Sequence, residues 1–249
     1  VDASVITERG SKGTDWRLHY CISLFDLKCD QFIITDPKTG ESLINFSISK
    51  GDLVIGDRAY GRIRSIEHAI DHEADFITRI KANAFKIYQN EKEIELLTLV
   101  SELKTSGQYN DWQIQVKTNS GKFIPLRLCA IRKSEQEIAI SQKKAKRNAN
   151  KKQIKISDYV LELCKYIIVV TSLIDCEVHT FKILELYRLR WQIEIAFKRL
   201  KSILGNLPKY DDLSCKAWLE GKMLVALLTQ AIVDEGRFFS PWGIKIRQR

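Results

Sequence analysis

Four polar side chains at helical spacing stand out in the last third of the chain. Tyr187, Arg190, Glu194 and Lys201 are separated by three, four and seven residues. At about 100° per residue of an α-helix, they fall within roughly 60° of arc and along about 21 Å of axis. One carboxylate would therefore share a narrow face with two cations and a phenol. A solvated helix face with weak ion pairing has the same pattern, so the chemical interpretation depends on other segments.

Carboxylates elsewhere in the chain could complete a metal site. Cleavage of a phosphodiester on two divalent cations needs two or three carboxylates from separate elements, because these hard cations prefer oxygen ligands. The candidates are Asp2 in the first expected strand, Asp57 at the end of a short apolar strand, and Glu194. Asp57 follows Gly56 at a strand end, which favours it over an arbitrary surface aspartate. For the first position the spacing leaves four rivals open: Asp15, Asp26, Asp30 and Asp36.

The first 82 residues alternate between strands and one helix. Apolar and β-branched runs predict an antiparallel meander, with a turn at residues 10–13 and strands at 1–6, 16–24 and 32–35. A strand, a helix and a second strand follow, at residues 53–57, 62–72 and 75–80. This order suggests a parallel strand pair.

The rest of the chain divides into a β-rich segment and two helices. Shorter strands are expected at 112–117, 123–131 and 166–171, so we interpret residues 83–178 as an insertion. One long helix is expected at 180–204, with an apolar face. A final helix at 211–235 is expected to pack in the core through its apolar side chains, which are Leu213, Trp218, Met223, Leu224, Leu227, Leu228 and Ile232.

A basic segment lies inside the insertion. No acidic residue occurs between Glu137 and Asp158, and the cations in this stretch are Lys143, Lys144, Lys146, Arg147, Lys151, Lys152 and Lys155. Such a run is often only a solvated helix or loop, but it also suits contact with phosphates. The chain of 249 residues carries a formal net charge of +9, with a pI near 9.2. This charge fits a polyanionic partner, with nucleic acid ahead of an anionic membrane surface.

Composition excludes several other classes. With 45% hydrophobic residues the chain can bury a large core, so it is not a disordered tail. The six cysteines have no metal-binding spacing and are expected to be reduced. No apolar run is long enough to span a membrane, and the start resembles neither a signal peptide nor a transit sequence. We therefore expect a soluble cytoplasmic protein without a membrane partner.

Three blocks of the sequence resemble a known family. The spacing Tyr187-x2-Arg190-x3-Glu194-x6-Lys201 is similar to the signature of bacterial insertion-sequence transposases of the DDE class, whose third acidic region has the Tyr-Arg-Glu-Lys pattern. Residues 2–6 with 10–19 resemble the first acidic region of that family. Residues 55–60, Ile-Gly-Asp-Arg-Ala-Tyr, resemble the second. Together the three blocks span almost the whole chain.

The resemblance implies a fold and a metal site. It implies an α/β, ribonuclease H-like mixed sheet with flanking helices, interrupted by a β-rich insertion before the helix that carries the last acidic residue. Residues 1–82 and 179–249 would form the core, and residues 83–178 the insertion. The resemblance also selects Asp2 over its rivals. It implies that Asp2, Asp57 and Glu194 are catalytic and bind Mg²⁺ or Mn²⁺, as two ions.

The resemblance further implies a DNA partner. Tyr187, Arg190 and Lys201 would hold DNA phosphates near the cleavage point, with Arg58 as a neighbouring contact. From the basic segment we add three DNA-binding candidates, Lys143, Lys144 and Arg147. The expected partners are double-stranded DNA, as transposon ends and target, and a second copy of the chain in a homodimer synapsed on DNA. Such a protein would be associated with the nucleoid.

The chain also departs from the family pattern. Relatives that cut through a DNA hairpin stack an aromatic residue on a flipped base, and the matching position here is Ile167, which leaves Tyr166 or Trp112 as stacking candidates. The chain starts one residue before Asp2, without the N-terminal region of relatives, so we expect a fragment. Two alternatives stay open: an inactive transposase remnant that only binds DNA, and a ribonuclease H-like nuclease without strand transfer.

Overall fold

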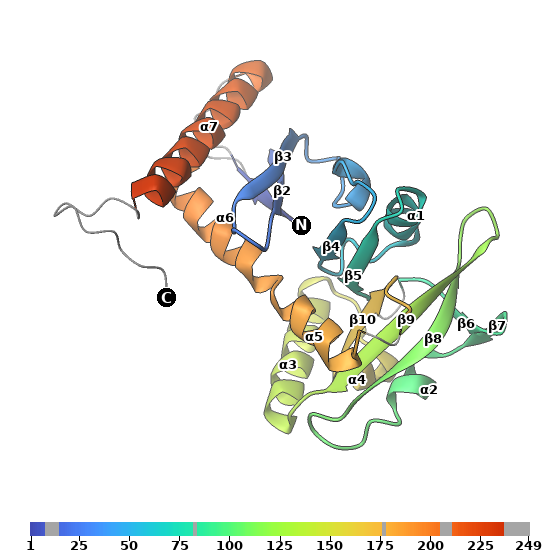
Figure 1. Cartoon of the computed structure of the whole chain (residues 1–249). Helices are drawn as coiled ribbons and strands as arrows, with labels where there is room; N and C mark the ends of the chain where they lie inside the picture. The colour runs from blue at the N-terminus through green and yellow to red at the C-terminus, as the bar shows by residue number, and fades with distance from the viewer. Residues whose placement is uncertain (8–14, 82–83, 176–177, 205–210, 237–249) are drawn as a thin grey trace. The chain divides into compact units, whose positions relative to one another are not determined.

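The computed structural model describes residues 1–7, 15–81, 84–175, 178–204 and 211–236, without the side chains of residues 201–204. The described chain is mixed α/β and forms two compact units (Figure 1). One unit comprises Val1 and Glu41–Arg190, and the other comprises Asp2–Gly40 and the described residues from Trp191 onward. None of the described helices has the length and apolar character needed to cross a membrane.

The unit that contains Asp2 is an antiparallel three-stranded sheet packed against two helices. Its strands, in the order β1-β2-β3, are Asp2–Ile6, Trp16–Ile22 and Cys29–Thr35, which confirms the predicted meander. The predicted turn at 10–13 lies outside the described residues. Alternate side chains of β2 point to one face, where Leu18 and Tyr20 pack against two helices, α6 (Trp191–Leu204) and α7 (Asp212–Gly236).

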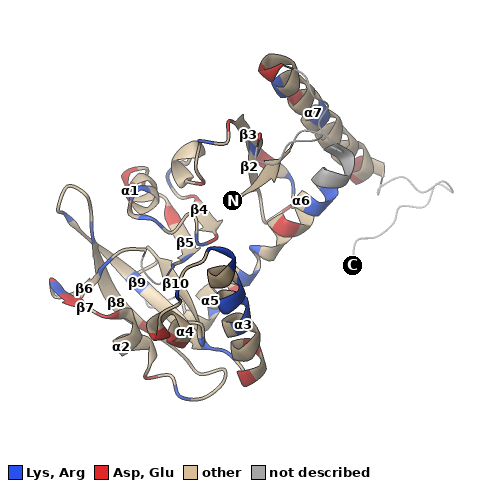
Figure 2. Ribbon diagram, turned by 180° about the vertical axis from the view of Figure 1, so that it is seen from behind, with Lys and Arg blue, Asp and Glu red and all other residues tan. Residues whose placement is uncertain are grey.

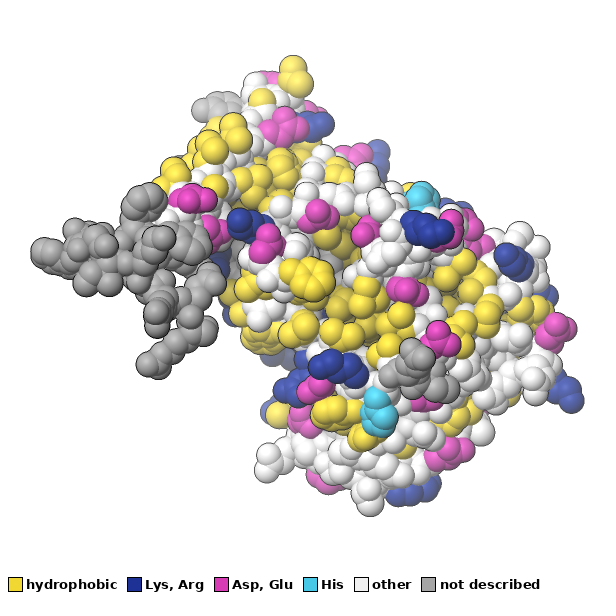
Figure 3. Space-filling model, in the orientation of Figure 1, with side chains coloured by type: hydrophobic (Ala, Val, Ile, Leu, Met, Phe, Trp, Pro, Cys, Tyr) yellow, Lys and Arg dark blue, Asp and Glu magenta, His cyan; other side chains and the backbone are white. Residues whose placement is uncertain are grey.

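Helix α7 packs through a narrower face than the sequence predicts. Its buried residues recur at three and four, namely Cys215, Leu219, Met223 and Ala226. The prediction that Leu213, Leu224, Leu228 and Ile232 lie in the core is wrong, because these side chains are 54% to 79% exposed. One stripe of the helix suffices to cover this part of the core. The remaining apolar side chains form part of the surface (Figure 3).

The other unit is built on a seven-stranded mixed sheet. The strand order is β4-β5-β10-β9-β8-β6-β7, and only β4 and β5 run parallel among these pairs. The predicted parallel pair is therefore confirmed. The strands are Leu53–Gly56, Asp75–Arg79, Ile87–Gln89, Lys92–Ile94, Tyr109–Lys117, Phe123–Arg132 and Tyr166–Thr171, for β4 to β10 in chain order. The helices are η1 (Leu43–Asn45), α1 (Ile63–Asp71), α2 (Leu96–Val100), α3 (Glu135–Lys151), α4 (Asp158–Leu163) and α5 (Thr180–Arg188).

A buried ion pair fastens α5 to one face of this sheet. The Arg127 guanidinium on β9 is 4% exposed and donates to Asp111 on β8 at 2.6 Å. The same guanidinium donates to the Thr180 hydroxyl at the start of α5 and to the carbonyl of Val178. The Thr180 hydroxyl in turn donates to Asp111. Breaking such a pair leaves an uncompensated buried charge, so this network holds the first turn of α5 on the sheet.

The predicted long helix at 180–204 is wrong, because two helices occupy this segment. Helix α5 ends at Arg188, and α6 begins at Trp191. Between them the amides of Leu189 and Arg190 donate to carbonyls only three residues back. This tighter turning rotates the following residues away from the α-helical phase. Tyr187 therefore belongs to α5 and Glu194 to α6, and Arg190 lies in the turn between the helices.

Candidate active site

Asp57 lies in the turn that follows β4, at the carboxyl end of the parallel pair. Its Oδ1 accepts a hydrogen bond from the Ala59 amide at 2.7 Å, and its carbonyl accepts one from the Tyr60 amide at 3.2 Å. An aspartate bonded to its own turn in this way has a fixed carboxylate direction. Ligands of open α/β sheets bind beyond the carboxyl ends of strands, so Asp57 is well placed for chemistry.

Two glycines allow the turn to approach its neighbours. A Cβ on Gly56 would lie 2.9 Å from the Cβ of the fully buried Tyr60. A Cβ on Gly61 would lie 2.4 Å from the carbonyl oxygen of Arg79, at the end of β5. Only the absence of a side chain at Gly56 and Gly61 allows the turn to approach Tyr60 and the Arg79 backbone so closely. The turn of Asp57 is thereby pressed against the end of β5.

Cations and a phenol gather around this turn from three further positions: Arg58 next to Asp57, Arg79 at the end of β5, and the α5 segment with Tyr187 and Arg190. Burial lowers the pKa of Arg79, the charges of Arg58 and Arg190 lower it further, and a hydrogen bond to Tyr187 opposes them. Burial raises the pKa of Tyr187, which Arg79 and Arg190 counter and the charge of Asp57 reinforces. Arg79 and Tyr187 therefore interact with each other and with Arg190, and they also connect to Arg58 through Arg79 and to Asp57 through Tyr187.

Lys133 adds a further cation from the segment between β9 and α3. It follows β9 and precedes α3, and its Nζ donates to the carbonyl of Cys164 at 2.6 Å and to the Ser141 hydroxyl at 3.0 Å. Burial lowers the pKa of Lys133 to about 8, and repulsion from Arg79 and Arg58 contributes to this decrease. The lysine therefore belongs to the same electrostatic environment as the Asp57 turn.

Sequence reasoning missed Arg79 and Lys133. Each is a cation at the carboxyl end of an apolar strand, β5 for Arg79 and β9 for Lys133. A cation at the end of an apolar strand can be recognised in the sequence. It points to a particular site only when the strand order is known.

Asp2 and Glu194 lie in the other unit. Asp2 begins β1, Glu194 is in the first turn of α6, and these two elements contact each other. The Oδ1 of Asp2 accepts a hydrogen bond from the Ala3 amide at 2.8 Å. Among the described residues, no group of three or more acidic, histidine or cysteine side chains is assembled as a metal site. Asp57 belongs to the unit that contains the seven-stranded sheet. The convergence of the three carboxylates therefore stays a prediction.

The chemistry of the donor set fits a hard divalent cation. All three candidates are carboxylates, whose oxygens Mg²⁺ and Mn²⁺ prefer. Asp57 is oriented by its own turn and is only half-buried. The surrounding arginines suit the phosphate that such a metal would share with the protein.

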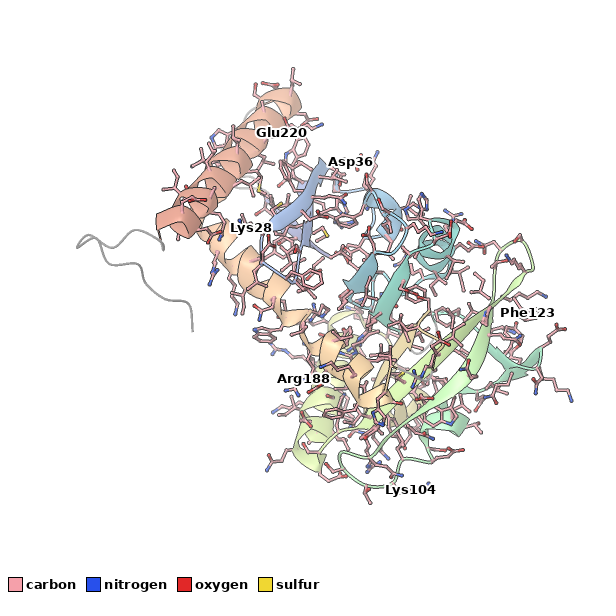
Figure 4. The ribbon with its side chains drawn as sticks, viewed as in Figure 1. Lys28, Asp36, Lys104, Phe123, Arg188 and Glu220 are labelled. Atoms are coloured by element: carbon pink, nitrogen blue, oxygen red, sulfur yellow. The ribbon has the colours of Figure 1, made fainter. Side chains whose placement is uncertain are left out.

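The remaining DNA-binding candidates are spread along two helices. Lys201 is in α6, and its side chain is outside the described part. The basic segment forms most of α3, in which Lys143, Lys144 and Arg147 are exposed. No ion pair of these three is found in the described part of the chain. Helix α3 begins with acidic residues and continues with basic ones, which are coloured red and blue on the ribbon of Figure 2. Arg188, labelled in Figure 4, adds an exposed cation at the end of α5.

The stacking candidates differ in exposure. Tyr166 is only 5% exposed in β10, so its ring is enclosed in the core and the expectation of an open stacking platform is wrong for it. Trp112 is partly buried in β8, and its Nε1 donates to Glu102 at 3.4 Å. A stacking role of Trp112 stays a prediction.

Comparison with known proteins assigns the family. The model of the transposase DDE domain family matches residues 34–226, which is most of the chain and includes Asp57 and Glu194. This chain belongs to the transposase DDE domain family. The transposase domain is 27% identical over 249 residues to the transposase of insertion sequence element IS421 of Escherichia coli, an alignment that covers 97% of this chain and 67% of the relative.

More distant relatives agree with this assignment. The transposase of IS231B of Bacillus thuringiensis subsp. berliner is 26% identical over 173 residues, which is 63% of this chain and 36% of the relative. The transposase of IS231C of the same organism is 26% identical over 211 residues, which is 77% of this chain and 43% of the relative. The DDE transposase domain predicted from the sequence is therefore confirmed. The two alternatives, an inactive transposase remnant that only binds DNA and a ribonuclease H-like nuclease without strand transfer, are not favoured.

Proposed function

We propose that this transposase domain cuts DNA at the ends of its insertion sequence and joins the cut strand to a target. Asp2, Asp57 and Glu194 are proposed to bind two divalent cations, Mg²⁺ or Mn²⁺. When bound, such ions activate the attacking water or DNA 3′-hydroxyl and stabilise the leaving oxygen. The observation that carries the proposal is the interacting group of four side chains, Arg58, Arg79, Tyr187 and Arg190, in which Arg58 follows Asp57 in the chain and Tyr187 feels its charge.

The residues of this group divide into binding and orienting roles. The guanidinium groups of Arg79 and Arg190 each offer forked donors that match phosphate oxygens. Tyr187 accepts a hydrogen bond from Arg79, which leaves its own hydroxyl proton for a phosphate oxygen. Its raised pKa keeps this proton on the phenol at neutral pH. Asp57 would thus meet a phosphate that is already oriented by fixed donors.

A hydrogen bond near the chain start supports the inclusion of Asp2. The backbone nitrogen of Val1 donates to the carbonyl of Ile55 at 2.7 Å, two residues before Asp57. Asp2 follows Val1 directly in the chain. A ribonuclease H-like arrangement, with a β-rich insertion at residues 83–178, remains part of the proposal, as do the synapsed homodimer and a location on the nucleoid.

The test is metal-dependent cleavage by single carboxylate variants. Asp57→Asn and Glu194→Gln preserve side-chain volume but remove the anionic ligand, so Mn²⁺-dependent nicking of DNA from the element's ends should fall at least about 100-fold. Asp26→Asn, at an exposed rival position of the meander, is the matched control and should cut normally. Undiminished cleavage by Glu194→Gln would contradict the assignment. Joining of a labelled 3′-hydroxyl end to target DNA separates a transposase from a simple nuclease.

A further inference from the structure

Arg79 and Lys133 lie on one face of the seven-stranded sheet, although they are 54 residues apart. Arg79 of β5 is paired with Val169 of β10, and Val169 is paired with Cys129 of β9. Residues directly opposite each other in a sheet share a face, and so do residues two apart along a strand. The amide of Lys133 continues the β9–β10 ladder by donating to the carbonyl of Lys165 at 2.9 Å. Lys133 is four residues beyond Cys129 and therefore projects to the same side as Arg79.

Helix α5 lies on this same face. Arg127, two residues before Cys129, bonds to Thr180 at the start of α5. The helix contacts β5, β8 and β9, and it carries Tyr187 to Arg79. The cations at the ends of β5, β9 and α5 therefore lie at the same end of the strands of this sheet.

Lys133 is held in place without a carboxylate partner among the described residues. Its two acceptors, the Ser141 hydroxyl on α3 and the Cys164 carbonyl at the end of α4, are neutral. An ammonium group has three donors, so one donor is left for another acceptor. The titratable and charged groups that act on it are Arg79 from β5, Cys164 directly after α4, Arg58 from the Asp57 turn and Glu137 from α3. Glu137 is engaged in the cap of α3, where its carboxylate accepts from the amide and hydroxyl of Ser134.

We propose that Lys133 is a further DNA-binding residue, which together with Arg58 and Arg79 takes a backbone phosphate next to the one held by Tyr187 and Arg190. This inference rests on the proposed function. A fixed ammonium beside two guanidinium groups has an excess of positive charge that a phosphate would neutralise. Burial is the main cause of the lowered pKa of Lys133, and a bound phosphate would neutralise the repulsion from Arg79 and Arg58 that adds to it. DNA binding should therefore be accompanied by proton uptake at Lys133.

The experiment measures DNA affinity as a function of pH. A labelled duplex from the element's ends is titrated with the full chain in EDTA, so that metal binding and cleavage do not contribute. For the wild type, affinity should fall above about pH 8, with a slope approaching about one decade per pH unit. Lys133→Met should bind about tenfold more weakly at pH 7 and lose this slope. Lys133→Arg should bind well and also lose the slope, because guanidinium does not titrate in this range.

Two controls separate binding from structural support. Ser141→Ala removes an anchor of Lys133 but keeps its charge, so affinity should stay within about twofold of the wild type. Lys86→Met removes an exposed lysine paired with Glu93 near the opposite edge of the sheet and should change nothing. In the wild type, the NMR signal of ¹³C-methylated Lys133, assigned by its absence in Lys133→Arg, should titrate at higher pH once DNA is added.

The outcomes are distinguishable from those of the proposed function. If the wild type binds and cuts DNA but Lys133→Met keeps its affinity and pH slope, only the role of Lys133 is refuted. The same holds if Ser141→Ala weakens binding as much as Lys133→Met does, because the lysine is then structural. A wild-type chain that binds no DNA would refute the proposed function and this inference together.

Discussion

At the scale of single residues, the site combines anchored carboxylates with an excess of cations. Asp57 is oriented by its own turn, whereas the interacting cations Arg79, Arg190 and Lys133 come from separate elements. Their mutual repulsion destabilises the DNA-free fold, as is common where a protein keeps charges together for a ligand. The proposed phosphate binding would offset this loss of stability.

Lys133 predicts a specific pH dependence of stability. Its pKa is about 8 in the folded chain, against 10.5 for the free side chain, so the unfolded state binds more protons between these values. The free energy of unfolding should therefore rise with pH in this window. Because the side chain is only partly buried, we expect the free energy of unfolding of the wild type to rise by about 1 kcal/mol between about pH 7 and pH 10, relative to that of Lys133→Met. Urea unfolding at several pH values measures it, and a constant difference between the two proteins would contradict the prediction.

At the scale of elements, the break between α5 and α6 decides how the signature residues are used. Tyr187 and Arg190 stay with the seven-stranded sheet, and Glu194 belongs to the helix that packs on the meander. The buried pair of Arg127 and Asp111 anchors the start of α5, so the position of Tyr187 depends on β8 and β9 as well. Elements distant in sequence therefore position the group of side chains that we propose to bind phosphate.

The turn at Asp57 yields a prediction about packing. Gly61→Ala would place a Cβ 2.4 Å from the Arg79 carbonyl, so either the turn or β5 must move. We expect a loss of about 2 kcal/mol in the free energy of unfolding, together with weaker DNA binding, because Arg79 is displaced. Gly40→Ala has no atom within 4 Å of its Cβ and is the control, with an expected change within about 0.5 kcal/mol. Thermal or urea unfolding compares the two variants; equal effects would refute the steric argument.

At the scale of the whole molecule, a net charge of +9 suits association with DNA. Of the cations near Asp57, Arg79 and Arg190 are partly buried and Arg58 is exposed, whereas the DNA-binding candidates of α3 are all exposed. We expect the first group to orient the reacting strand and the second to contribute sequence-independent affinity.

Salt dependence tests this division. Replacing Lys143, Lys144 and Arg147 together by Gln should reduce the slope of log K against log salt by about 2 to 3, equally for all DNA sequences. Lys50→Gln and Lys86→Gln remove lysines that are already paired with Glu73 and Glu93, so the double variant should keep the wild-type slope. Fluorescence anisotropy over a range of salt concentrations gives the slopes. An unchanged slope for the α3 variant would exclude this helix from the DNA interface.

The sequence alone determined the identity of most elements and of the family. Alternating and helical periods are local properties, so the meander, the parallel pair of β4 and β5, and α1 were predictable, and the spacing from Tyr187 to Lys201 pointed to a DDE transposase. The break at Leu189 and Arg190 was not predictable, because no proline or glycine marks it. The gathering of Arg79 and Lys133 was not predictable either. It follows from the strand order β5-β10-β9, which is set by long-range pairing and burial. Only the tertiary structure places the ends of β5 and β9 at the same end of the sheet.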